Sequence, residues 1–209
     1  MLLDTSNQIV NPSPPIVVGI TGASGAVMAD AVIRTLLLCD VPVVTTISAA
    51  GRLVWVEEMD ESFGIAIERW SDFGSINNHP IGELNAPIAS GTFTTRGMVI
   101  VPCSMTTMAA VSNGLADNLL RRAADVTIKE KRPLVIIPRE TPLNSIHLEN
   151  MAYLANQGVT ILPPHPPFYL KHTGLDETID FLAERTLLAL KISDELPDKY
   201  VYRGPKDGN

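Results

Sequence analysis

The charged pair Arg139-Glu140 is the first candidate for chemistry in this sequence. It follows an apolar, β-branched run at residues 134–137, which predicts a strand buried on both faces. Pro138 and Pro142 flank the pair and restrict its backbone. Ligands of parallel α/β sheets bind at the carboxyl ends of strands, where a guanidinium and a carboxylate can bind an anion and transfer a proton. Taken alone, such a pair is more often a solvated loop, so the rest of the chain has to decide.

Small polar residues follow two other predicted strands. Residues 22–25 (Gly-Ala-Ser-Gly) follow a strand at 16–20, and residues 104–107 (Ser-Met-Thr-Thr) follow one at 98–101. Each turn precedes a predicted helix, so backbone N–H groups and hydroxyls converge on a helix N-terminus, a favourable place for a phosphate. Ser48 ends a further predicted strand and adds a hydroxyl to the same crevice. Serine and threonine are also ordinary helix caps, so either turn alone is a weak signal.

A cluster of positive charge strengthens the prediction of an anionic ligand. Six of the sixteen basic residues lie within residues 121–139, against two acidic residues, in a chain of net charge -7. Within this cluster Arg122, Asp125 and Lys129 share one face of a predicted helix. Asp125 either holds both cations as a surface salt-bridge set or orients them toward an anionic substrate. The negative total argues against nucleic acid as the main partner.

The elements that must position these residues alternate between strand and helix. Residues 60–97 are less regular and are predicted to hold a short helix and loops. The alternation predicts an α/β fold, a three-layer α/β/α sandwich whose parallel sheet has helices on both faces. The predicted strands are 16–20, 41–47, 98–101, 134–138 and 159–162, and the predicted helices after the first, which ends near Leu38, are 49–58, 105–112, 118–131, 145–156 and 176–192.

One domain at residues 16–195 is expected, between a flexible N-terminal arm (1–15) and a loosely held tail (196–209). The arm lacks the features of a signal peptide, so we expect a cytoplasmic protein. No apolar run approaches the roughly 20 residues of a membrane span, and the 45% hydrophobic content suggests surface buried between subunits of a homo-oligomer. The two cysteines and four histidines show no metal-ligand spacing, so no metal is expected.

The glycine turn at residues 21–26 excludes one nucleotide-binding motif and resembles another. It is not a P-loop, because no Gly-Lys-Ser/Thr follows. It resembles the opening of short-chain dehydrogenases, which need a tyrosine with a lysine four residues later. Tyr153 is followed at that distance by Gln157, and Tyr169 by Thr173, so this alternative lacks its chemistry.

Longer motifs resemble the UbiX-type flavin prenyltransferases (the UbiX/Pad family), which include small proteins of bacterial phenolic-acid decarboxylase systems. The resemblance runs from about Ile16 to Arg185. It implies a Rossmann/flavodoxin-like fold, assembly as a dodecamer and an active site where subunits meet. The matching segments are GASGA (22–26), ISAAG (47–51), ASG (89–91), VPCSM (101–105), RAADV (122–126), IKE (128–130), PRETPL (138–143), IHLENM (146–151) and FY (168–169).

The resemblance also implies an activity. Such an enzyme binds reduced FMN and dimethylallyl phosphate, needs no metal, and joins the dimethylallyl group to flavin N5 and C6, closing a fourth ring. The product, prenylated FMN, is the cofactor of a partner UbiD-type decarboxylase.

Site residues are carried over one by one from the family motifs. Glu140 is the expected acid/base, Ser24 a proton relay near N5, and Glu58 a further group of the same site; Arg122 and Lys129 stabilise the departing phosphate. The expected FMN contacts are Gly22, Ala23, Ser24, Ser48, Ser104, Met105, Thr106, Thr107 and Arg139. The expected contacts of dimethylallyl phosphate are Tyr169, Arg185, Arg122, Lys129 and Glu140.

The sequence departs from the family in places. Thr106 stands where many relatives have lysine, and His165 where methionine or alanine is more usual. A C-terminal tryptophan near the site is missing, and Tyr200 is expected to stand in for it. Two alternatives stay open. An FMN-dependent decarboxylase of the cysteine-decarboxylase group would need a catalytic histidine and a PxMNxxMW-type segment, which we do not find. A non-catalytic flavin carrier would need no prenyl-phosphate residues.

Overall fold

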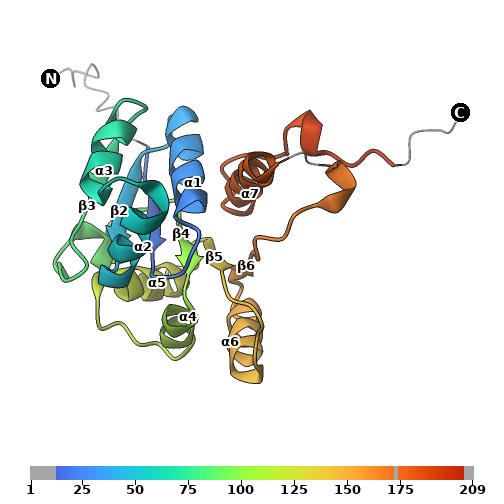
Figure 1. Ribbon diagram of the computed structural model, residues 1–209. Helices are drawn as coiled ribbons and strands as arrows, with labels where there is room; N and C mark the ends of the chain where they lie inside the picture. Colours follow the sequence, from blue (N-terminus) through green and yellow to red (C-terminus); the bar gives the residue numbers. More distant parts are fainter. Residues whose placement is uncertain (1–12, 172–173, 205–209) are drawn as a thin grey trace, which may run out of the picture.

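The computed structural model describes residues 13–171 and 174–204, which fold around a six-stranded, fully parallel sheet (Figure 1). The strand order is β3-β2-β1-β4-β5-β6. The α/β fold and the parallel sheet predicted from the alternation of elements are thereby confirmed. The strands are β1 (Ile16–Ile20), β2 (Val43–Ile47), β3 (Ile76–Asn78), β4 (Gly97–Cys103), β5 (Leu134–Pro138) and β6 (Thr160–Ile161).

Helices cover both faces of the sheet, because the central strands are apolar on both sides. On one face, α1, α2, α3 and α7 pack against strand residues that include Val18 and Val99. On the other face, α4, α5 and α6 pack against the alternate strand residues, which include Val17 and Ile100. The helices are α1 (Ala26–Leu38), α2 (Ala49–Met59), α3 (Phe63–Ser71), α4 (Met105–Ser112), α5 (Leu119–Lys129), α6 (Ser145–Asn156) and α7 (Leu175–Ala189), with 3-10 turns η1 (Pro87–Ala89), η2 (Phe168–Leu170) and η3 (Asp198–Tyr200). None of the helices within the described residues is long and apolar enough to cross a membrane.

Two strands differ from the sequence prediction for physical reasons. The edge strand β3 was missed because Ile-Asn-Asn is short and polar, without the apolar pattern of a buried strand. Strand β4 extends beyond the predicted 98–101 through Pro102 to Cys103, although proline cannot donate to a strand ladder. The register between β4 and β5 shifts between Ile100 and Cys103, and proline is tolerated at such irregularities.

The C-terminal segment folds back on α7. Tyr200 is 4% exposed and its ring meets that of Phe181 edge-on at a centroid distance of 5.2 Å. This part of the predicted loose tail is therefore packed on the body of the protein. The expected arm at 1–15 is described only from residue 13 onward, and residues 205–209 also lie outside the described part of the chain.

Candidate active site

The crevice between β1 and β4 is the topological switch point of the sheet, since the chain leaves these neighbouring strands in opposite directions. Thr21, directly after β1, is 2% exposed. Its hydroxyl donates to the Pro102 carbonyl at 2.7 Å and accepts from the Ser104 N–H at 2.7 Å. One buried side chain thus holds the turn after β1 against the turn after β4.

The turn after β5 joins the same group. The Arg139 N–H donates to the Cys103 carbonyl at 3.2 Å, which ties the end of β5 to the end of β4. The structure therefore brings together the three turns at residues 22–25, 104–107 and 138–142, as their positions after parallel strands predict.

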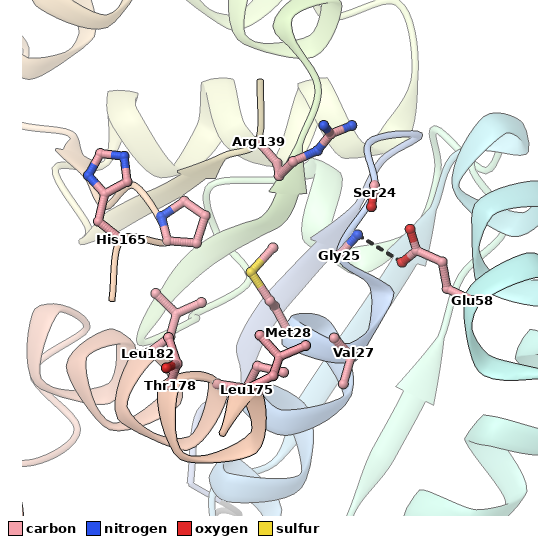
Figure 2. Close-up of a pocket in the computed structure, with 12 residues that line it drawn as sticks. Ser24, Gly25, Val27, Met28, Glu58, Arg139, His165, Leu175, Thr178 and Leu182 are labelled. Atoms are coloured by element: carbon pink, nitrogen blue, oxygen red, sulfur yellow. Dashed lines mark hydrogen bonds between the residues drawn. The ribbon is translucent and has the colours of Figure 1, made fainter. Parts of the chain in front are cut away.

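Glu58 reaches this crevice from the last turn of α2. Its Oε2 accepts from the Gly25 N–H at 2.8 Å (Figure 2) and from the Ala26 N–H at 2.7 Å, and the Ser24 hydroxyl also bonds to the carboxylate. Helix α1 has no side-chain cap of its own, so Glu58 caps it from another helix. Burial alone would raise the pKa of Glu58, but these hydrogen bonds and the nearby Arg139 charge together lower it.

This contact changes the prediction for the first turn. The N–H groups of Gly25 and Ala26 at the start of α1 are already bonded to a carboxylate, so they are not free for a phosphate as the sequence suggested. At α4, Ser104 accepts from the Thr107 N–H at 3.3 Å, and the first-turn N–H groups of Met105 and Thr106 have no partner within the helix. The start of α4 is therefore the better phosphate site of the two.

Ser48 acts as the cap of α2, accepting from the Gly51 N–H at 3.0 Å. Gly22 lies against Ala50 in the first turn of the same helix, so closely that a Cβ at position 22 would collide with it. Ser48 thus fixes the first turn of α2, and Gly22 allows that turn to lie close to the turn after β1. Among the described residues, no group of three or more His, Cys, Asp or Glu side chains could hold a metal ion.

A cavity of about 520 Å³ opens between α1 and α7, and we call it the α1–α7 cavity. Figure 2 shows Ser24, Glu58 and Arg139 at its polar end. The Arg139 Nε is buried and has no hydrogen-bond partner among the described residues, so an acceptor from a ligand would satisfy it. The other lining residues are Gly25, Val27, Met28, Pro164, His165, Leu175, Thr178, Ile179 and Leu182.

A second cavity of about 450 Å³, which we call the Glu140 cavity, adjoins the first at Arg139. Three residues line both cavities: Arg139, Pro164 and His165. The remaining lining residues of the Glu140 cavity are Pro138, Glu140, Thr141, Leu143, Met151 and Pro163. The structure thus places Glu140 next to the group formed by Ser24, Glu58 and Arg139.

Arg122 and Lys129 lie elsewhere, on α5, and line neither cavity. Arg122 donates to the Ala89 carbonyl at 3.0 Å and pairs with Asp125 at 2.7 Å, whereas Lys129 pairs with Glu130 at 2.7 Å. Of the two alternatives for Asp125, the one in which it pairs with both cations is seen only for Arg122 among the described residues, since Lys129 pairs with Glu130. One chain alone does not bring these two cations to Glu140.

Tyr169 and Arg185 are exposed and also line neither cavity. The aromatic ring beside Tyr169 is Tyr202, edge-on at a centroid distance of 5.4 Å. Tyr200, the expected stand-in for the missing tryptophan, is instead buried against Phe181. Within the described tail, Tyr202 is therefore the better candidate.

Two parts of the site were missed in the sequence. Thr21 looked like the first residue of a turn, because the partners of its hydroxyl lie 81 and 83 residues away. The apolar wall from α7 was not predicted as part of the site, since Leu175, Ile179 and Leu182 have ordinary core spacing. Neither Thr21 nor these residues of α7 have a sequence pattern that distinguishes a site residue from an ordinary turn or core residue.

A polar crevice at the switch point of a parallel sheet, next to a helix N-terminus, defines a nucleotide-binding type of α/β protein. The family described as Flavoprotein matches residues 5–185. A flavin prenyltransferase UbiX from Halalkalibacterium halodurans is 45% identical over 184 residues, covering 86% of this chain and 89% of that protein. This chain therefore belongs to the UbiX flavin prenyltransferase family.

Solved structures agree with this assignment. AnUbiX (PadA1), crystallised in complex with FMN and dimethylallyl pyrophosphate, is 34% identical with a TM-score of 0.83, covering 93% of this chain and 100% of that one. A dodecameric FMN-dependent UbiX-like decarboxylase from Escherichia coli O157:H7 is 35% identical with a TM-score of 0.82, covering 91% and 100%.

The role of Thr21 predicts a specific pattern of stability. Thr21→Val should lower the free energy of unfolding by about 1–3 kcal/mol, because it removes two hydrogen bonds and leaves the part-buried Ser104 N–H without its partner, while the Pro102 carbonyl keeps only the Thr21 backbone N–H. Thr21→Ser keeps the hydroxyl and should lose less. Urea denaturation measures both, and Thr186→Val is a matched control, since within the described part of the chain the buried Thr186 hydroxyl bonds to the Leu182 carbonyl of its own helix alone. Equal stability of the Val and Ser variants at position 21 would refute this role.

The lowered pKa of Glu58 predicts that the stability of the protein depends on pH. Its folded-state pKa is lower than its unfolded value, so its contribution is present above the unfolded pKa and is lost as pH falls through the folded pKa. Wild type should be more stable than Glu58→Gln at pH 7, and the difference should shrink below about pH 4. Denaturation at a series of pH values measures this, with Glu57→Gln as a control of equal charge change. A difference that does not vary with pH would contradict the prediction.

Proposed function

We propose that this chain transfers the dimethylallyl group of dimethylallyl phosphate to N5 and C6 of reduced FMN. The product, prenylated FMN, would serve a UbiD-type decarboxylase. The observation that carries the proposal is the pair of adjoining cavities around Arg139, one with Ser24 and Glu58 and the other with Glu140, in a chain 45% identical to a flavin prenyltransferase.

FMN fits the residues of the switch-point crevice. The first-turn N–H groups of Met105 and Thr106 suit its phosphate, with the Ser104 hydroxyl close by. The apolar wall of the α1–α7 cavity suits a flat ring, and the buried Arg139 Nε suits a carbonyl or ring nitrogen of the flavin. Reduced flavin supplies the two nucleophilic atoms of the reaction.

The remaining residues handle charge and protons. Breaking the allylic C–O bond leaves a phosphate, which Arg122, Lys129 and Arg185 would stabilise through charge-assisted hydrogen bonds, together with the Tyr169 hydroxyl. Glu140 would accept the proton released when the bond to C6 is complete. The Ser24 hydroxyl, bonded to Glu58, would exchange a proton near N5.

If Arg122 and Lys129 act together with Glu140, the site would need more than one copy of the chain. Glu140 lines a cavity that Arg122 and Lys129 do not line, so a second copy would bring its α5 to the first. A homo-oligomer, expected to be a dodecamer, is supported by the related dodecameric structure and by apolar side chains exposed on α2 and α6. These side chains are Leu53, Val56, Ile146, Leu148 and Tyr153.

Two alternatives from the sequence are less well supported. A non-catalytic flavin carrier would need no second cavity with a carboxylate beside the first. A decarboxylase of the cysteine-decarboxylase group would need the PxMNxxMW-type segment, which the sequence lacks.

The activity is tested directly with purified protein. Given reduced FMN and dimethylallyl phosphate without oxygen, wild type should yield a flavin heavier by one prenyl unit, detected by mass spectrometry. Heat-denatured protein is the control. Recovery of unmodified flavin, with FMN binding shown separately, would reject the proposed reaction.

The shared site is tested by complementation. Arg122→Ala and Glu140→Gln should each lower turnover by about 100-fold or more while keeping FMN binding. When the two variants are co-expressed with different tags, about a quarter of the sites in mixed oligomers should hold both native residues, and activity should return to that extent. Variants purified separately and then mixed without subunit exchange are the control. Inactive mixed oligomers would show that both residues serve a site within one chain.

A further inference from the structure

The two cavities meet at a shared wall, and this wall contains an ionisable side chain that the proposed mechanism does not use. The wall is formed by Arg139, Pro164 and His165. If the proposed function holds, flavin and prenyl phosphate occupy adjoining spaces and their reacting atoms must approach each other beside this wall. His165 is therefore close to the place where the allylic C–O bond breaks.

The backbone of His165 is held in one place. Two prolines precede it and two follow it, which restricts the chain on both sides. The His165 N–H donates to the Pro163 carbonyl at 2.8 Å, and the loop is tied to β5 by the Leu162 N–H, which donates to the Ile136 carbonyl at 2.8 Å. A side chain on such a loop is positioned without a bond to its ring.

The ring of His165 has no hydrogen-bond partner among the described residues, and the side chain is exposed to the cavities. Figure 2 shows it across the α1–α7 cavity from Glu58. Whatever its protonation state, an imidazole carries at least one N–H that can donate to an anion. Its donor is thus available to a ligand.

An anion bound beside this wall would find few hydrogen-bond donors, because carboxylates as well as a cation surround it. Arg139 is the one cationic side chain that lines the Glu140 cavity within the described residues, and the cavity also contains the Glu140 carboxylate. The Glu58 carboxylate lines the other cavity, where the N–H groups of α1 bond to it. A phosphate entering the Glu140 cavity would therefore gain from a further N–H donor on this chain.

We propose that His165 is a further substrate-contacting residue, whose ring N–H donates to the phosphate of the prenyl donor next to Arg139. This inference rests on the proposed function for the identity of the ligand. It assigns to His165 a contact with the leaving group and none with FMN.

The test is a binding measurement in which no turnover occurs. Protein loaded with oxidised FMN is titrated with dimethylallyl phosphate by calorimetry. His165→Phe keeps a ring but removes the donor, and the Kd should rise tenfold or more, as expected for a hydrogen bond to a charged group. His165→Asn and His165→Gln place an amide N–H near the two ring nitrogens, and at least one should keep the Kd within about threefold of wild type. The Kd for FMN should be the same in all variants.

His79→Phe is the matched control, because His79 follows β3, the edge strand opposite β6, and pairs with Glu83. An unchanged Kd in His165→Phe would overturn the inference, as would a failure of both amide variants to restore binding. A rise in the Kd for FMN alone would assign His165 to the flavin and overturn it too.

The outcome is separable from that of the proposed function. If wild type binds dimethylallyl phosphate but forms no prenylated flavin, the proposed function fails and the Kd comparison still decides the role of His165. If wild type does not bind dimethylallyl phosphate, both proposals fail.

Discussion

The buried hydroxyl of Thr21 is the constraint on which the site depends. It accepts from the Ser104 N–H and donates to the Pro102 carbonyl, so the turns after β1 and β4 are fixed to each other at the switch point. The carbonyl of Cys103, the residue between Pro102 and Ser104, accepts from the Arg139 N–H, which adds the turn after β5 to this group. Loops at the carboxyl edge of a sheet are usually its most mobile parts. Here three of them are joined by hydrogen bonds, so the residues that they carry keep fixed relative positions.

Glu58 decides how charge is distributed in the crevice. Because its carboxylate caps α1, the positive end of that helix dipole is already compensated by the protein. Among the described residues, no such carboxylate bonds to the start of α4, so the electrostatic preference for an added phosphate moves toward residues 104–107. The same contact holds the Ser24 hydroxyl against a carboxylate, which is the arrangement a proton relay requires.

Sequence patterns predicted the features that depend on neighbouring residues in the chain and on the order of its elements. Buried strands and the α/β alternation came from apolar runs, and the approach of Ser24, Ser104 and Arg139 came from the rule that parallel strands end at one edge. Contacts between distant segments were not predictable in this way. The carboxylate of Glu58 lies 33 residues from the N–H that it caps, and Tyr202 rather than Tyr200 meets Tyr169 because Tyr200 is buried on α7. Family motifs predicted Glu58 as a site residue, whereas its role as the cap of α1 came only from the structure.

The separation of charge within one chain links assembly to the proposed catalysis. The cavities hold the carboxylates of Glu58 and Glu140 around Arg139, whereas Arg122 and Lys129 lie on α5, paired with Asp125 and Glu130. A phosphate dianion is unfavourable beside Glu140 until further cations approach. A neighbouring α5 would bring two of them, and their exposed ion pairs are weak enough to rearrange. Under this mechanism an isolated chain would bind flavin but hold prenyl phosphate poorly, so activity would follow oligomer formation and not folding alone.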